Sequence, residues 1–164
     1  MTEKELLVWE KIRDFELDDT ESSFTFTDRL ARENSWSMQY ATRAVFEYKK
    51  FIFLICIDPG PKTPSDEIDQ VWHLHLLYTY SYWQEMCKNL LNKDIHHGPT
   101  KGAEQRDDFK NYYAETKRLY EKYFNAAPPI DIWPNEQERF SQIHFSRVNR
   151  HTNWVIPKLK LRKK

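Results

Sequence analysis

The stretch SMQYATRAVFEYKKFIFLIC, residues 37 to 56, predicts the helix around which the rest of the chain folds. Ser37 is a favourable first residue because its hydroxyl can accept a hydrogen bond from a free backbone N–H of the first turn. Apolar residues then recur every three or four positions, as on one face of a helix. After Lys50 the segment is apolar on every side, so its second half is expected to lie in the centre of the core.

The chain on both sides of this segment also has helical patterns, which predict an all-α fold. Thr2 followed by Glu5 has the spacing of a capping box. Thr27 and Ser65 are expected to cap two later helices. The predicted helices cover residues 2–15, 27–36, 37–56, 65–91 with a kink near 78–80, 103–124 and 136–140.

Length and composition set the architecture that these helices can form. A chain of 164 residues is long enough to build a core without disulfides or an obligatory metal. Its three glycines argue against glycine-rich phosphate loops, and proline-rich connectors separate the helical segments. We therefore predict a compact, single-domain bundle of five or six helices over residues 1–157. Residues 158–164 are expected to form an extended, disordered basic tail.

The formal net charge of zero hides an uneven distribution. Residues 141–164 hold seven basic residues and no acidic one, so residues 1–140 hold the other 18 basic residues and all 25 acidic residues. An acidic body would repel phosphate, which argues against a nucleic-acid partner. A protein partner could instead bind the basic tail or the tyrosine-rich helix faces, of which the one in 103–124 is the clearest.

The cysteines and the apolar runs bear on the cellular compartment. Cys56 and Cys87 lie 31 residues apart without a CxxC pair and are expected to be free thiols. The N-terminus alternates charged and apolar residues, unlike the hydrophobic segment of a signal peptide. The longest apolar run, residues 51–57, is far shorter than the roughly 20 residues of a membrane span. These features predict a cytoplasmic protein without a membrane span.

Residue types that bind metals are concentrated in Asp69-Gln-Val-Trp-His73-Leu-His75 and in a later loop with His96 and His97. On a helix, Asp69 and His73 are four residues apart and share a face, so both side chains can bind one metal ion. His75 lies about 200° around the helix from His73, and it is an alternative ligand only if the helix is distorted. A loop imidazole, from His97 or alternatively from His96, can complete the set because the chain between them is long enough to fold back.

A carboxylate and two imidazoles with an open position suit catalytic zinc or non-haem iron. Zinc is the first expectation, with Fe(II) or Mn as alternatives. The ion would be structural or would support hydrolysis by an activated water. His75 and Tyr82 are the candidate catalytic residues, because they would lie behind the ligands or in the adjoining pocket.

A competing interpretation needs no metal. A histidine between Trp72 and Leu74 on a helix is often a core residue, and Asp69 would then only orient His73. In that case the histidines form a buried polar network, and the protein is a non-catalytic protein-protein interaction domain.

The segment PSDEIDQVWHLHLLYTYSYWQEMC, residues 64–87, closely resembles bacterial members of the glycine-rich domain-containing protein family. The resemblance extends to RLARENSWSMQYATRAVFEYKKF before it and to HHGPTKG and PPIDIWP after it, and it covers about residues 26–157. Its most specific motif, D-x-x-W-H-x-H-x-L followed by a tyrosine, falls on these residues: Asp69, Trp72, His73, His75, Leu77 and Tyr82.

The resemblance implies no particular fold, reaction or cofactor. It does imply that Asp69, His73, His75 and His97 belong to one shared polar or metal site, since a loop histidine that matches His96 or His97 recurs in the family pattern. With three glycines, the chain lacks the glycine-rich segment that gives the family its name.

Overall fold

The protein is described by a computed structural model, which covers residues 1–98, 106–141, 145, 148–149 and 151–156. In these residues the structure has seven helices and no strand, which confirms the all-α fold. The helices are α1 (Glu3–Arg13), α2 (Phe26–Asn34), α3 (Met38–Ile57), α4 (Asp66–Leu77), η1 (Tyr80–Leu91), α5 (Arg106–Phe124) and α6 (Glu136–Arg139). The six helical ranges predicted from the sequence correspond to seven helices, because the kinked helix expected over 65–91 forms two separate helices, α4 and η1. The predicted tail at 158–164 and the predicted helix start at 103–105 lie outside the described residues.

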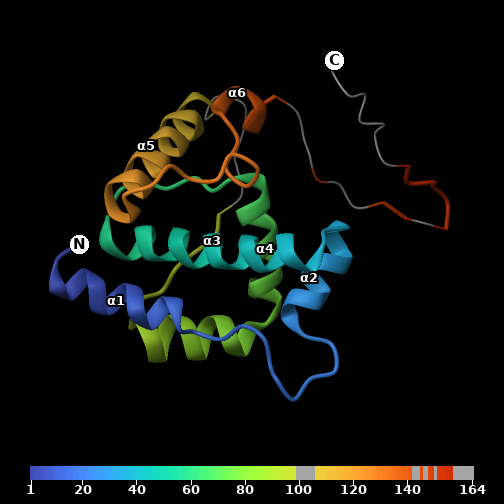
Figure 1. Cartoon of the computed structure of the whole chain (residues 1–164), viewed down its shortest axis with the longest axis horizontal. Coiled ribbons are helices and arrows are strands. Elements are labelled where there is room, and N and C mark those ends of the chain that lie inside the picture. Colours follow the sequence, from blue (N-terminus) through green and yellow to red (C-terminus); the bar gives the residue numbers. More distant parts are fainter. Residues whose placement is uncertain (99–105, 142–144, 146–147, 150, 157–164) are drawn as a thin grey trace.

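Helix α3 lies at the centre of the fold, as residues 37–56 predicted. Ser37 caps it by accepting a hydrogen bond from the backbone N–H of Tyr40. The residues from Phe51 to Leu54 are completely buried. Helices α1, α2, α4 and α5 all pack against α3, and Figure 1 shows α5 on one side of it and α1 on the other. The apolar surface of this one helix therefore organises the whole core.

Side-chain caps determine where the helices begin. The predicted capping box between Thr2 and Glu5 is present, and Ser65 caps α4 as predicted. The prediction that Thr27 caps the second helix is wrong. Thr25 caps α2 instead, because it exchanges reciprocal hydrogen bonds with Asp28 three residues later. The Thr27 hydroxyl lies 2.7 Å from the carboxylate of Asp18, to which it donates a hydrogen bond.

The tyrosine-rich face of α5 packs against the rest of the chain. Tyr113 and Tyr120 are buried, and Tyr123 is half-buried. The hydroxyls donate to acceptors within the chain: Tyr113 to the carbonyl of Pro134, Tyr120 to Glu47 and Tyr123 to Glu5. Each buried hydroxyl thus has the partner that it needs in a dry environment.

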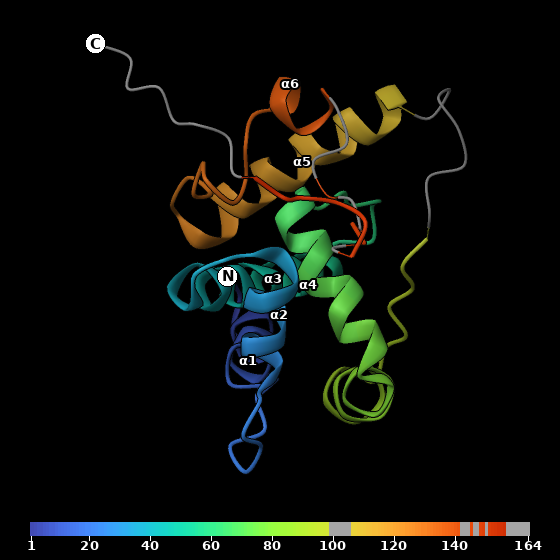
Figure 2. The ribbon, with the colours of Figure 1, turned by 90° about the vertical axis from the view of Figure 1, so that its right-hand side faces the viewer.

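Helices α4 and η1 carry the predicted site residues from Asp69 to Tyr82. In Figure 2, α4 runs from the side of α5, past α3, to η1, which is seen nearly end-on. Helix η1 is a π-helix, whose hydrogen bonds join residues five apart. Tyr82 and Cys87, which are five residues apart, are both fully buried. Such π-helical segments are rare, and they often occur at functional sites.

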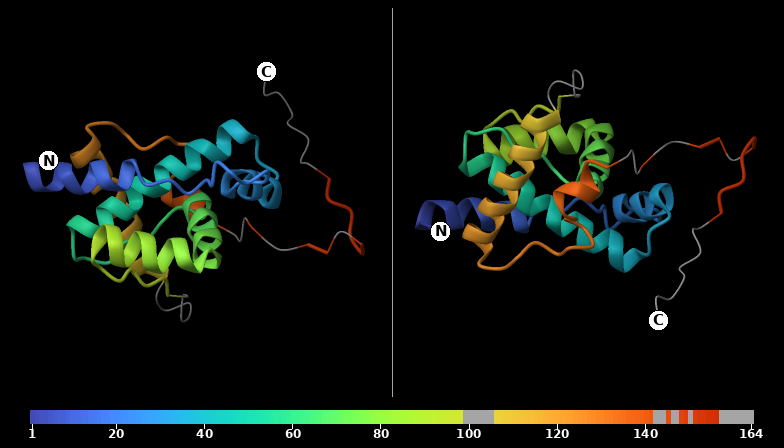
Figure 3. Two further views of the ribbon diagram at one scale, coloured as in Figure 1. Left: turned by 90° about the horizontal axis from the view of Figure 1, so that it is seen from below. Right: turned by 90° about the horizontal axis from the view of Figure 1, so that it is seen from above.

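The last described residues, 151–156, extend away from the helices (Figure 3). Trp154 is 96% exposed there and Ile156 is 82% exposed. Both cysteines are free thiols, and Cys87 is buried. Among the helices of the described residues, none is both long and apolar enough to span a membrane.

Candidate metal centre

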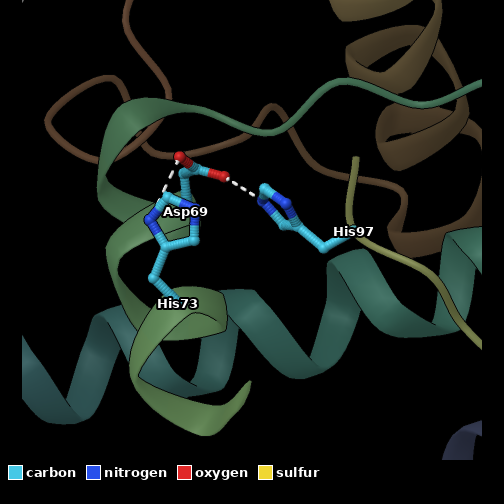
Figure 4. Close-up of side chains that lie close together, drawn as sticks. All are labelled: Asp69, His73 and His97. Carbon is cyan, nitrogen blue, oxygen red and sulfur yellow. Dashed lines mark hydrogen bonds and ion pairs between the residues drawn. The ribbon is translucent and has the colours of Figure 1, made fainter. Parts of the chain in front are cut away.

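Asp69, His73 and His97 form a cluster between α4 and the segment that follows η1. Figure 4 shows Asp69 and His73 on α4, with His97 reaching toward them from the opposite segment. Oδ1 of Asp69 lies 2.7 Å from Nε2 of His97, and Oδ2 of Asp69 lies 3.7 Å from Nδ1 of His73. Each residue offers one ligand atom, and the three atoms all lie within 4.8 Å of one another. The cluster could therefore hold a metal ion.

The helical periodicity of α4 explains how this cluster arises. Ile68, Val71, Trp72 and Leu74 form the buried face of α4 against the core. Asp69 and His73 are four residues apart along the edge of that face, so their side chains lie one turn apart on the same side. The carboxylate lies between the two imidazoles, and its hydrogen bond with His97 bridges α4 to a segment 28 residues later in the chain.

The spacing of the ligand atoms fits a small divalent ion. Zinc binds imidazole nitrogen and carboxylate oxygen at about 2.0 Å, so two ligands on a tetrahedral zinc lie about 3.3 Å apart. The two distances from Asp69, 2.7 Å to His97 and 3.7 Å to His73, lie on either side of this value. Small movements of the side chains would bring the two pairs to this spacing.

The cluster faces solvent on one side. The side chain of His73 is 51% exposed, whereas the side chains of Asp69 and His97 are 22% and 17% exposed. An ion held here would keep a side toward water, because His73 is the most exposed of its three ligands. Sites with three protein ligands and an accessible fourth position are typical of catalytic zinc, whereas structural zinc sites are closed by four ligands.

His75 does not join the cluster. It is 1% exposed, and its ring nitrogens lie 2.9 Å from the hydroxyl of Tyr48 and 3.3 Å from Oγ of Ser81. Burial lowers the pKa of His75 to about 3, so this imidazole is neutral at physiological pH. His75 is a hydrogen-bonded core residue that connects α3, α4 and η1.

His96 also lies outside the cluster. Its exposed ring lies beside Trp83, with 5.6 Å between the ring centroids. Trp83 lines a shallow cavity of about 580 Å³ along η1 that none of the three clustered residues lines. The loop histidine that reaches Asp69 is therefore His97, whereas the sequence had left His97 and His96 as alternatives.

Tyr82 is fully buried and does not reach the solvent-facing side of the cluster. Its hydroxyl lies 2.9 Å from Nε1 of Trp72 and 2.6 Å from the carbonyl oxygen of Ile95. Sequence reasoning missed Trp72, whose ring meets that of His97 edge-on with 4.4 Å between centroids. A buried indole N–H needs a hydrogen-bond partner, and this requirement is the feature of the sequence that could have linked Trp72 to Tyr82.

No family model, curated protein or solved structure matches this chain.

Proposed function

We propose that this protein is a zinc protein in which Asp69, His73 and His97 hold one ion on the surface of an all-α fold. The observation that carries the proposal is the convergence of three ligand atoms within 4.8 Å, from a helix and from a segment 28 residues away. A carboxylate with two imidazoles suits catalytic zinc or non-haem iron; zinc is the first candidate, and Fe(II) and Mn are the alternatives.

Hydrolysis is the reaction class that this donor set favours. When bound, zinc lowers the pKa of a coordinated water toward neutrality and polarises a substrate carbonyl or phosphoryl oxygen. The exposure of His73 supports a position open to water and substrate. The Asp69 carboxylate lies 2.7 Å from Nε2 of His97 and 3.7 Å from Nδ1 of His73, so it would share one ion with both imidazoles.

Metal analysis of protein purified without a polyhistidine tag tests this proposal. We expect about one equivalent of zinc per chain and a higher thermal midpoint after zinc is added to the stripped protein. Less than about a tenth of an equivalent, with no thermal shift on adding zinc or iron, would contradict the proposal.

The affiliation with the glycine-rich domain-containing proteins, which depends on the motif from Asp69 to Tyr82, is part of the same proposal. A cytoplasmic location is another part, and its support is that Cys56 and Cys87 are free thiols. Reducing compartments keep thiols in this state.

A second candidate is a non-catalytic interaction domain. The observation that favours it is the exposure of Trp154 (96%) and Ile156 (82%), which precede the Lys- and Arg-rich residues 158–164 in the sequence. An acidic protein partner would match this segment in charge. Replacing Trp154 and Ile156 by serine should then weaken binding of an acidic partner protein while leaving zinc affinity unchanged.

A further inference from the structure

The hydroxyl of Tyr82 connects α4 and η1 to the segment that supplies His97. It accepts a hydrogen bond from Nε1 of Trp72 on α4, at 2.9 Å. It donates a hydrogen bond to the carbonyl of Ile95, at 2.6 Å. Tyr82 is fully buried, and Ile95 and Trp72 are only 3% and 6% exposed. In such a dry setting each of these polar groups depends on the hydroxyl for its hydrogen bond.

The same contacts determine which loop histidine faces α4. In an extended segment, alternate side chains point to the same side. Ile95 is buried, His96 is exposed and His97 is half-buried, so Ile95 and His97 share the inner side. The bond from Tyr82 to Ile95 fixes the backbone two residues before His97, and Trp72 contacts the His97 ring edge-on.

We propose that Tyr82 is a positioning residue of the metal centre, which holds residues 95–97 in the register that turns His97 toward Asp69. This inference rests on the proposed zinc site and names the group that preorganises it. A ligand on an unanchored segment would lose conformational entropy when it binds the ion, and the affinity would fall accordingly. Groups that orient metal ligands typically change affinity by about 10- to 100-fold.

The substitution Tyr82→Phe tests the inference because it removes only the hydroxyl. Zinc affinity, measured by competition with a chromogenic chelator, should fall by about 10- to 100-fold. The matched control is Tyr113→Phe, which removes an equally buried tyrosine hydroxyl that also donates to a loop carbonyl, that of Pro134 at 2.8 Å. Tyr113→Phe should leave zinc affinity within about twofold of the wild type, even if it destabilises the fold to a similar extent.

A double-mutant cycle with His97→Ala shows whether Tyr82 acts through His97. If it does, Tyr82→Phe should weaken zinc binding in the wild-type background and have little further effect in the His97→Ala background. The visible spectrum of the cobalt-substituted protein provides a readout that overall stability does not change. Tyr82→Phe should shift this spectrum toward that of His97→Ala, and Tyr113→Phe should not.

The outcomes separate this inference from the proposed function. If the wild type does not bind zinc, the metal site itself is wrong. If the wild type binds and Tyr82→Phe behaves like Tyr113→Phe, or if its effect adds fully to that of His97→Ala, the positioning role is wrong. Should Tyr82→Phe fail to fold, Trp72→Phe breaks the same chain of hydrogen bonds at its other end and keeps an aromatic ring beside His97. It should then bind zinc more weakly than Tyr113→Phe does, and equal affinity would overturn the inference.

Discussion

Nε2 of His97 lies 2.7 Å from Oδ1 of Asp69, although the two residues are 28 positions apart in the sequence. This contact closes the cluster that His73 and Asp69 begin on α4. Hydrogen bonds and packing through Trp72 and Tyr82 link α4 and η1 to the segment that carries His97.

Removing a ligand should weaken metal binding far more than removing its neighbour. We expect Asp69→Asn, His73→Ala and His97→Ala each to lower zinc affinity by at least the 10- to 100-fold that is typical of groups around a metal site. His96→Ala is the matched control, because His96 precedes His97 directly and its exposed ring lies beside Trp83. Isothermal titration with zinc measures all four variants. Equal losses for His96→Ala and His97→Ala would refute the assignment of His97.

Removal of the metal should leave the fold intact. The core around α3 is built from buried side chains such as Tyr48, Phe51 and Ile52, and a chain of this length does not need an ion to fold. Far-UV circular dichroism at 25 °C should therefore be unchanged by a chelator. The metal-bound form should still be the more stable one, by about 2.7 kcal/mol at a free zinc concentration 100 times the dissociation constant. Unfolding on chelation would instead indicate a structural metal site.

Two salt bridges that involve residues of α3 should differ strongly in their contribution to stability. Glu47 is 5% exposed and accepts hydrogen bonds from Trp133, Tyr120 and Lys50. Glu47→Ala leaves the buried Trp133 and Tyr120 donors without their acceptor and Lys50 without its counter-charge, and it should lower the free energy of unfolding by about 3 to 5 kcal/mol.

The comparison for Glu47 is Arg43→Ala on the same helix. Arg43 pairs with Asp131, and both side chains are nearly half exposed. Its removal should cost less than about 1 kcal/mol, because solvent screens an exposed pair. Urea denaturation measures the free energy of unfolding of both variants. A similar loss in the two would show that burial does not determine how much these salt bridges stabilise the fold.

The buried His75 should make stability depend on pH. Its pKa is about 3 in the folded protein and near 6.5 in the unfolded chain. Above pH 6.5 both states are neutral, so the folded state keeps its full stability. As pH falls from 6.5 to 3, only the unfolded chain gains the proton, and stability drops by up to about 1.4 kcal/mol per pH unit.

Urea denaturation of the metal-free protein between pH 7 and pH 4 measures this loss, with His75→Gln as the reference. Glutamine keeps hydrogen-bonding groups but does not titrate. The stability difference between wild type and variant should shrink as the pH falls. If the free energies of unfolding of wild type and His75→Gln change in parallel over this pH range, the protonation of His75 does not contribute to the pH dependence of stability.

Local patterns in the sequence predicted much of the fold. Ser37 and Ser65 cap their helices because a hydroxyl beside a free N–H is a local feature, and the apolar run after Lys50 could only be buried. Thr27 is also a favourable cap residue by type, but the reciprocal pair that Thr25 forms with Asp28 fixes the start of α2 two residues earlier. The break between α4 and η1 was expected, but the π-helical geometry of η1 was not, since a segment of 12 residues does not distinguish the two helical periods.

The candidate site was predictable only in part, for a physical reason. The four-residue spacing of Asp69 and His73 predicts from the sequence alone that they share a helix face. The choice between His96 and His97 depends instead on contacts between distant segments of the fold. The bond from Tyr82 to Ile95 and the contact of Trp72 with His97 are such contacts, and both join distant segments. Residues 99–105 and 157–164 lie outside the described structure, so the basic tail remains a prediction.

The most direct test of the zinc site is the X-ray absorption spectrum of the one-to-one zinc complex. We expect only nitrogen and oxygen ligands at about 2.0–2.1 Å, with the scattering pattern of two imidazoles, and one imidazole fewer in His97→Ala. Sulfur at about 2.3 Å, which would implicate Cys56 or Cys87, or a spectrum that His97→Ala leaves unchanged, would contradict a centre built from Asp69, His73 and His97.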